Sequence, residues 1–205
     1  MDERHMVNKL KAQLAPRYRK ILVHKNLATL TGFKAELEQR FGFLPVLNEV
    51  DMILVGKKGH LCAIEVKCFT VNAGSFSRPF YDGIGQSLSL LRYGFDHVAL
   101  WHLFSSDIDQ SRLDRYGAAT WWFIRNRTGL PLEFTYFKVE DHPETPKFIV
   151  MQYEGPNTGA DLLPIDSSNF FVTWKHPNPF VQTEEAKGLR AALVNALEIA
   201  NIVLP

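Results

Sequence analysis

The pattern of apolar and polar positions is clearest between residues 49 and 67, where two short apolar segments flank a turn. Residues 50–55 and 61–66 are rich in branched aliphatic side chains, which favour β-strands. The sequence Gly-Lys-Lys-Gly at 56–59 joins them with residues typical of tight turns. The pattern therefore predicts a β-hairpin, with a further short strand before it at 43–47.

Apolar side chains spaced by three and four residues predict helices on both sides of this hairpin. One such stripe runs from Leu27 to Phe41 and ends at Gly42, a residue typical of helix C-termini. The sequence also allows an earlier helix at 6–14, which 18–22 either continues or follows as a turn. After the hairpin, a polar loop leads to a helix at about 81–93 and an apolar strand at 97–104. The expected order is helix, three strands, helix, strand.

The rest of the chain predicts an additional section of helices and strands. We expect a helix at 107–127, strands at 132–139 and 147–153, an irregular segment at 155–179 and a last helix from Thr183 to about Ala200. No internal repeat, low-complexity tract or linker divides the sequence. The prediction is an α/β fold in one domain over 1–205, with a core at about 27–104, a mixed central sheet flanked by helices, and a C-terminal α+β elaboration at 105–205.

Three charged residues interrupt the apolar hairpin, namely Asp51, Glu65 and Lys67. Side chains alternate across a strand, so Glu65 and Lys67 point to the same face, and Asp51 can reach that face if the strands pair through the turn. Two carboxylates and an ammonium at one end of a hairpin suit a divalent cation and a water molecule. The simpler interpretation is a surface ion pair of Asp51 and Lys67 beside a solvated Glu65.

Asp51 followed by Glu65-Val66-Lys67 on a hairpin resembles the PD-(D/E)XK nuclease superfamily, in particular its resolvase-like and RecB-like branches. The resemblance covers roughly residues 27–104, and Val50 stands where the family name has proline. It implies a restriction-endonuclease-like core and a nuclease that hydrolyses DNA phosphodiesters with Mg²⁺ (or Mn²⁺). Asp51, Glu65 and the backbone carbonyl of Val66 would then be metal ligands, and Lys67 would orient the attacking water or stabilise the transition state.

The same resemblance nominates two supporting residues. The helix before the hairpin often brings a further acidic side chain, for which Glu36 and Glu38 are both available, and Glu36 is favoured by its Gly-Phe-Lys-Ala-Glu context. Gln86, in the helix after Lys67, resembles the glutamine of the RecB-like motif, although Leu90 occupies the place of the tyrosine expected four residues later. Each of the two could equally be an ordinary surface or capping residue.

Composition narrows the setting without defining the activity. The chain has 205 residues, is 46% hydrophobic and 22% charged, and has a formal net charge of +1, as in ordinary soluble globular proteins. No apolar run is long enough to span a bilayer, and no signal sequence is recognisable, so no membrane association is expected. The two cysteines, Cys62 and Cys68, are not expected to form a bridge, which fits a reducing, cytoplasmic location.

Charge is uneven along the chain. Residues 1–40 hold nine Lys and Arg against four Asp and Glu, and this basic section could contact the phosphates of DNA. It could also be an ordinary solvated surface. A homodimer would let two sites cut both strands of a duplex. The alternatives to a DNA nuclease are a nucleic-acid-binding or assembly protein that keeps the fold without cleaving, and a nuclease acting on RNA.

Overall fold

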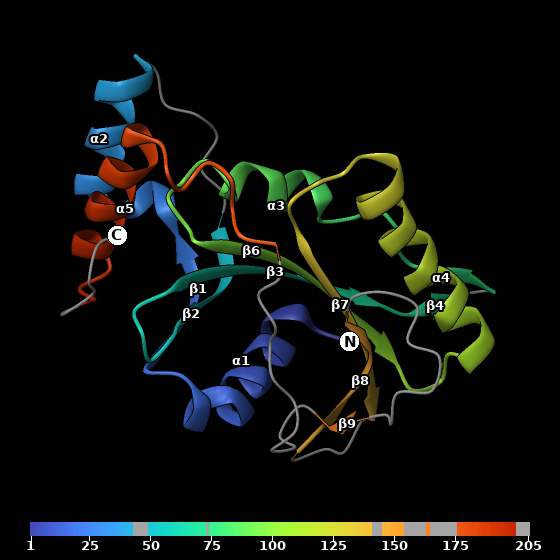
Figure 1. Cartoon of the computed structure of the whole chain (residues 1–205). Coiled ribbons are helices and arrows are strands. Elements are labelled where there is room, and N and C mark those ends of the chain that lie inside the picture. The colour runs from blue at the N-terminus through green and yellow to red at the C-terminus, as the bar shows by residue number, and fades with distance from the viewer. Residues whose placement is uncertain (43–48, 73, 141–144, 154–162, 165–175, 200–205) are drawn as a thin grey trace.

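A mixed β-sheet runs through the molecule, as seen in the computed structural model (Figure 1). The structure describes residues 1–42, 49–72, 74–140, 145–153, 163–164 and 176–199. Seven strands lie in the order β1-β2-β3-β6-β7-β8-β9. Their bounds are β1 Lys20–Asn26, β2 Glu49–Val55, β3 Leu61–Phe69, β6 His97–Ser105, β7 Glu133–Glu140, β8 Lys147–Tyr153 and β9 Leu163–Pro164.

The sheet is parallel in its centre and antiparallel towards both edges. β3, β6 and β7 are parallel neighbours, whereas β1, β2 and β3 pair antiparallel, as do β7, β8 and β9. Parallel neighbours need a crossover connection. Helix α3 (Ile84–Leu90) lies in the connection from β3 to β6, and α4 (Gln110–Trp122) with its continuation η3 (Phe123–Arg127) lies in the connection from β6 to β7.

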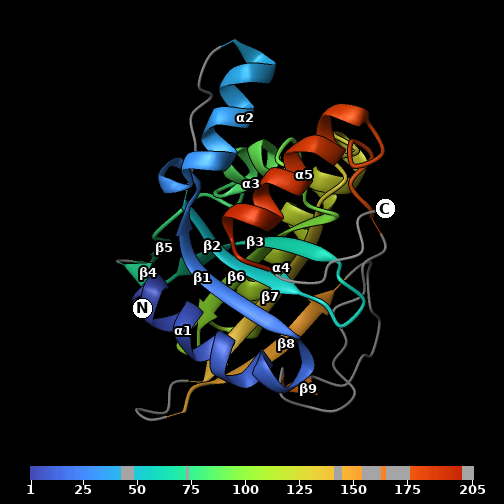
Figure 2. The same ribbon diagram turned by 90° about the vertical axis from the view of Figure 1, so that its left-hand side faces the viewer.

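Helices cover both faces of the sheet, which explains why β3 is buried along its whole length and β6 along all but its last residue (Figures 1 and 2). On one face, α1 (Glu3–Leu14) packs Met6, Val7, Leu10 and Leu14 against β2, β3 and β6. On the other face lie α2 (Thr31–Phe41), α3, α4 and α5 (Glu184–Ala196). Short elements complete the described chain: η1 (Ala15–Arg17), η2 (Leu27–Thr29), β4 (Val71–Asn72) and β5 (Ser75–Phe76).

The expected order of helix, three strands, helix, strand is found only if the inserted helix α2 is set aside, and its first two elements then come from other segments. The helix is α1 and the first strand is β1, whereas the strand predicted at 43–47 lies outside the described residues. The interpretation of 18–22 as helix or turn was wrong, because β1 begins at Lys20. The apolar run of β1, Ile21-Leu22-Val23, is only three residues long and is flanked by Lys20 and His24, as suits an edge strand, where lysines and polar side chains are common. Helix α2 is inserted between β1 and β2.

Several other predictions are confirmed. The hairpin closes through the Gly56–Gly59 turn, and Gly42 ends α2 in the left-handed conformation (φ 70°). The helix and strands expected after residue 105 are present as α4, β7 and β8, but β7 and β8 extend the central sheet itself. Both cysteines are buried and free. None of the helices described is long and apolar enough to cross a membrane.

A buried ion pair fastens α5 to the sheet. Arg190, the guanidinium of which is almost fully buried, lies 2.6 Å from the Asp96 carboxylate and also donates to the Gly59 carbonyl at 3.1 Å. The same Asp96 oxygen accepts the Leu61 backbone N–H at 2.6 Å. This network joins α5, the start of β6 and the turn of the β2–β3 hairpin.

Replacing Arg190 should therefore destabilise the fold severely. Arg190→Met leaves the Asp96 carboxylate buried without its cation, and we expect the free energy of unfolding to fall by about 3–5 kcal/mol in urea denaturation. Lys187→Met, on an exposed side of the same helix, should change it by less than about 0.5 kcal/mol. The double variant Asp96→Asn/Arg190→Met should recover part of the loss, and a loss as large as in the single variant would contradict an electrostatic cause.

Candidate active site

The site forms where the antiparallel pairing of β2 with β3 stops. This pairing extends from Val55/Leu61 to Met52/Ile64. At the next position the Asp51 carboxylate, rather than a backbone carbonyl, accepts the Val66 N–H at 2.8 Å. In an extended strand the N–H and C=O of one residue point to the same side, so the Val66 carbonyl is also directed towards the β2 side of β3. Its role as a metal ligand stays a prediction.

Glu65 and Lys67 lie on β3 one side-chain repeat apart, and both are almost completely buried. The Lys67 Nζ is 2.6 Å from Glu65 Oε1. Lys67 is only 5% exposed to solvent and Glu65 only 1%. A solvated surface pair is therefore excluded. The stem of Lys67 passes directly beneath Gly83, at which an added Cβ would come within 3.0 Å of Lys67 Cγ and 2.6 Å of a Leu100 methyl carbon. Gly83 has φ +85°, so both its backbone and its lack of a side chain are needed there.

A third carboxylate enters from α1, which sequence reasoning missed. Glu3 Oε1 is 3.6 Å from Lys67 Nζ, and Glu3 Oε2 is 3.6 Å from Arg78. Arg78 is held in turn by Asp82 at 2.7 Å. Glu3 lies in the first turn of α1, immediately after the N-cap Asp2. Its acidity there was visible as a helix-start signal, but its distance from Lys67 depends on how α1 packs on the sheet.

The electrostatics of this cluster favour an additional cation. Burial raises the pKa of Glu65, and the neighbouring Asp51 charge raises it further against the effect of Lys67. Burial also raises the pKa of Asp51, despite the hydrogen bond from Val66. Burial by itself would lower the pKa of Lys67, but the Glu65, Glu3 and Asp51 carboxylates outweigh it, so the pKa of Lys67 is raised overall. Glu65 Oε2 is buried and has no hydrogen-bond partner in the structure. A divalent cation would both neutralise the excess negative charge and occupy this oxygen.

A second group of ligand atoms shares Asp51. Single ligand atoms of His24, Glu49 and Asp51 lie within 4.8 Å of one another, and this group could hold a metal ion. His24 stands opposite Asp51 between two paired positions of β1 and has φ +52°, which is uncommon for a residue with a side chain. Neither ring nitrogen of His24 has a hydrogen-bond partner, although Nδ1 lies 3.5 Å from Glu49. Glu49 is also bound by Arg4 through two 2.8 Å hydrogen bonds.

His102 braces the segment that covers Lys67. Its ring is fully buried on β6, with Nε2 3.2 Å from the Asp82 carbonyl, which places Asp82 and Gly83 over the Lys67 stem. Burial lowers the pKa of His102 to about 3, so the ring is neutral and its Nε2–H can donate to that carbonyl. Phe69 and Phe134 pack against the ring with centroids 4.5 and 5.0 Å away.

Neither of the supporting residues predicted from the sequence has a hydrogen bond to the carboxylate cluster in the described structure. Gln86 lies half-buried in α3, and the structure gives its side chain no hydrogen bond to Asp51, Glu65 or Lys67. Its supporting role stays a prediction. Glu36 lies on α2, where it bonds Arg40 at 2.6 Å, and Glu38 is exposed on the same helix. The acidic residue that contacts Lys67 from a helix is Glu3 instead, because α1 rather than α2 packs beside the site.

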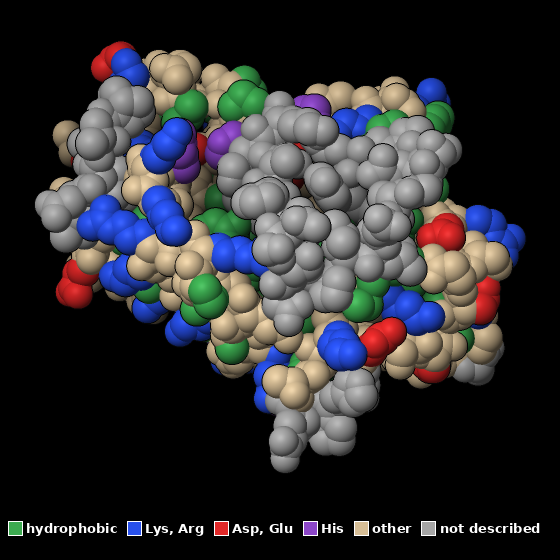
Figure 3. Space-filling view, turned by 60° about the horizontal axis from the view of Figure 1, so that its bottom comes forward, with side chains coloured by type: hydrophobic (Ala, Val, Ile, Leu, Met, Phe, Trp, Pro, Cys, Tyr) green, Lys and Arg blue, Asp and Glu red, His purple; other side chains and the backbone are tan. Residues whose placement is uncertain are grey.

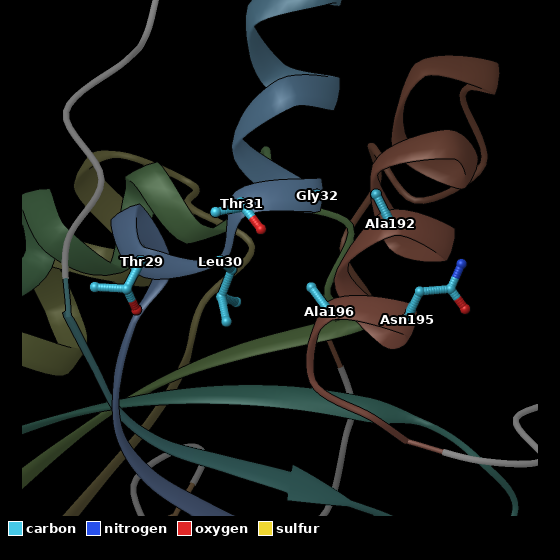
Figure 4. Close-up of a pocket in the computed structure, with 7 residues that line it drawn as sticks. All are labelled: Thr29, Leu30, Thr31, Gly32, Ala192, Asn195 and Ala196. Atoms are coloured by element: carbon cyan, nitrogen blue, oxygen red, sulfur yellow. The ribbon is translucent and has the colours of Figure 1, made fainter.

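A separate cavity of about 510 Å³ opens between the start of α2 and the end of α5 (Figure 4). It contains none of the residues predicted for the site and no ionisable side chain. Its lining residues are Thr29, Leu30, Thr31, Gly32, Ala192, Asn195 and Ala196. The chemistry-bearing groups are therefore concentrated at the hairpin and not in this cavity.

Comparison with known proteins gives little guidance. No family model matches the chain, and no curated protein matches it. One similar solved structure is that of Pyrococcus furiosus SfsA in complex with Ca²⁺, which is 13% identical, with a TM-score of 0.36 over 74% of this chain. The match spans 64% of the SfsA chain. A likeness at this level is too weak to decide either the fold family or the function.

The raised pKa of Glu65 predicts how stability depends on pH and on divalent cations. Because the folded state holds a proton on Glu65 more tightly than the unfolded state, chelator-treated protein should lose stability as pH rises through that raised pKa. Added Mg²⁺ or Mn²⁺ should restore the melting temperature at neutral pH. Glu65→Gln should flatten both dependences, whereas Glu36→Gln should keep them. Identical thermal-melting profiles for the parent and Glu65→Gln would refute this account.

Proposed function

We propose that this protein is a Mg²⁺-dependent nuclease that hydrolyses DNA phosphodiester bonds, built on a restriction-endonuclease-like core. The observation that carries the proposal is the buried cluster of Asp51, Glu65 and Lys67, in which one glutamate oxygen has no partner. Burying these charges in an otherwise apolar hairpin is unfavourable for stability alone. Function is the better explanation for them.

The donor set suits a hard cation. Asp51, the free oxygen of Glu65 and the carbonyl of Val66 are oxygen ligands of the kind that Mg²⁺ prefers, and Mg²⁺ usually keeps several waters. His24, next to Asp51, adds an imidazole that Mn²⁺ tolerates better than Mg²⁺ does. When bound, the cation would act as a Lewis acid and increase the acidity of a coordinated water.

The protein's own side chains would then have distinct roles. The Lys67 ammonium, fixed by Glu65 and by the covering Gly83, can donate a hydrogen bond to the attacking water or to a phosphoryl oxygen that gains charge. Arg78, which is 39% exposed at its side chain, lies beside this cluster and can bind a neighbouring phosphate of the substrate. Glu3 and Asp82 hold Lys67 and Arg78 in position.

The test is a comparison of cleavage rates on linear, branched and single-stranded DNA, with RNA of the same sequences alongside. Lys67→Ala should keep DNA binding but lower the cleavage rate by about 100-fold or more, since a donor used in the transition state is lost. Asp51→Asn should abolish cleavage because it weakens the ligand set, and chelator should do the same to the parent. Lys34→Ala, on α2, should cleave like the parent.

The variants need equal folding, shown by circular dichroism, before their rates are compared. If Lys67→Ala and Asp51→Asn both cleave as fast as the parent, the proposed site is wrong. If the parent binds DNA but cleaves no substrate with Mg²⁺ or Mn²⁺, a binding protein on this fold is the better description. Faster cleavage of RNA than of DNA would show that RNA is the substrate, while the proposed site would stay the same.

A further inference from the structure

One group of side chains in the described part of the chain is arranged as metal ligands usually are. We define the His24 group as His24, Glu49 and Asp51, each of which offers one ligand atom within 4.8 Å of the other two. Among the described residues, no other three His, Cys, Asp or Glu side chains meet this criterion. On the face that Figure 3 shows, by contrast, Asp and Glu side chains lie in several separate places among Lys and Arg side chains. The grouping at β1 and β2 is therefore a particular feature of this fold.

Two paired strands and a helix hold the His24 group in place. His24 lies on β1 directly opposite Asp51 on β2, between two paired positions of these strands. Glu49 is the first residue of β2, and Arg4 of α1 donates hydrogen bonds of 2.8 Å to both of its carboxylate oxygens. A carboxylate oxygen that accepts such a bond can still bind a cation, because it has two lone pairs. All three ligands therefore lie on regular secondary structure.

The ring of His24 is the observation that points to a ligand. Both of its nitrogen atoms are buried from solvent, and neither has a hydrogen-bond partner among the described residues. Its Nδ1 lies 3.5 Å from Glu49 Oε1, which is longer than a charge-assisted hydrogen bond between such groups. Bonds of about 2.1 Å would place two ligands of a tetrahedral cation about 3.4 Å apart. The separation therefore suits two ligands of one cation better than a direct hydrogen bond.

The His24 group differs from the ligand set proposed above for Mg²⁺. Glu65 does not belong to the group, and Asp51 is the side chain that the two sets share. The first set, with Glu65 and the Val66 carbonyl, offers oxygen atoms alone, which Mg²⁺ prefers. The His24 group offers an imidazole nitrogen together with two carboxylates, a combination that suits Mn²⁺, Co²⁺ and Zn²⁺. Strand β1 thus adds a ligand set of different metal preference beside the first.

We propose that His24, Glu49 and Asp51 bind a second divalent cation, of the transition-metal class that includes Mn²⁺ and Zn²⁺. The proposal rests on the function above only for the neighbouring Mg²⁺ position. Asp51 serves both cations, so an ion in the His24 group fixes the carboxylate beside that position. Three protein ligands leave room for water in the coordination shell. Affinity should rise from Mn²⁺ through Co²⁺, and Mg²⁺ should compete poorly because it prefers oxygen ligands.

The test measures Co²⁺ binding to the full chain by visible absorption, after metal is removed with chelator and the chelator by dialysis. The site variant is His24→Asn, because asparagine, like histidine, is among the residues found most often at positive φ but lacks the imidazole. It should weaken Co²⁺ binding at least about tenfold, since even groups that only orient a ligand have effects of that size. The matched control, His5→Asn, removes an exposed imidazole from α1 and should keep the parent affinity.

Two acidic variants identify the ligands independently of His24. Glu49→Gln should weaken Co²⁺ binding as His24→Asn does, whereas Glu65→Gln should leave the tight binding unchanged. Glu38→Gln, at an exposed position of α2, is the control for the lost charge. Zn²⁺ should displace the bound Co²⁺ at a much lower concentration than Mg²⁺ does. Each variant is first shown by circular dichroism to fold like the parent.

The opposite pattern would overturn the proposal. A loss of Co²⁺ binding in Glu65→Gln but not in His24→Asn would assign the ion to the Mg²⁺ position. Absence of saturable Co²⁺ binding by the parent would leave His24 and Glu49 as an ordinary ion pair. Because these readouts need no cleavage, a parent that binds Co²⁺ through His24 but cuts no nucleic acid would refute the proposed function alone. Cleavage with Mg²⁺ by a parent without such binding would refute the second cation alone.

Discussion

The backbone N–H of Val66 determines how this hairpin is used. In a continuous ladder it would bond a carbonyl of β2, but here the Asp51 carboxylate accepts it at 2.8 Å. This hydrogen bond places a carboxyl group inside the sheet at the point where pairing of β2 and β3 ends. It also aligns the Val66 carbonyl with Asp51 and brings Asp51 close to Glu65, which follows from strand geometry. The remainder of the site is arranged around that one hydrogen bond.

The surrounding structure holds the charged side chains of the site in place but leaves most of the carboxylate charge without a neutralising partner. Lys67 is held by Glu65 on one side and covered by Gly83 on the other, while His102 holds the segment that carries Gly83. The buried Glu65 Oε2 is left without a partner, and the carboxylates of Asp51 and Glu3 surround the same ammonium. A rigid site with surplus negative charge could bind a divalent cation with little reorganisation, which would suit the phosphodiester hydrolysis proposed above.

Helix α1 has two tasks in this fold. Its inner face closes one side of the sheet with Met6, Val7, Leu10 and Leu14. Its N-terminal turn brings Glu3 to the site, and its C-terminal end leads to the basic residues beside the hairpin turn.

The sequence by itself determined the hairpin and the shared face of Glu65 and Lys67, because alternation along a strand and turn chemistry are local properties. It also indicated α2, α4, β6 and β7 through apolar periodicity. Tertiary structure alone decided that β1, an edge strand with one short apolar run, completes this side of the sheet. It also decided that Glu3, and not Glu36, reaches Lys67, and that His24 and Glu49 lie beside Asp51. The physical reason is that these contacts join segments far apart in the chain, and their distances depend on how helices pack on the sheet.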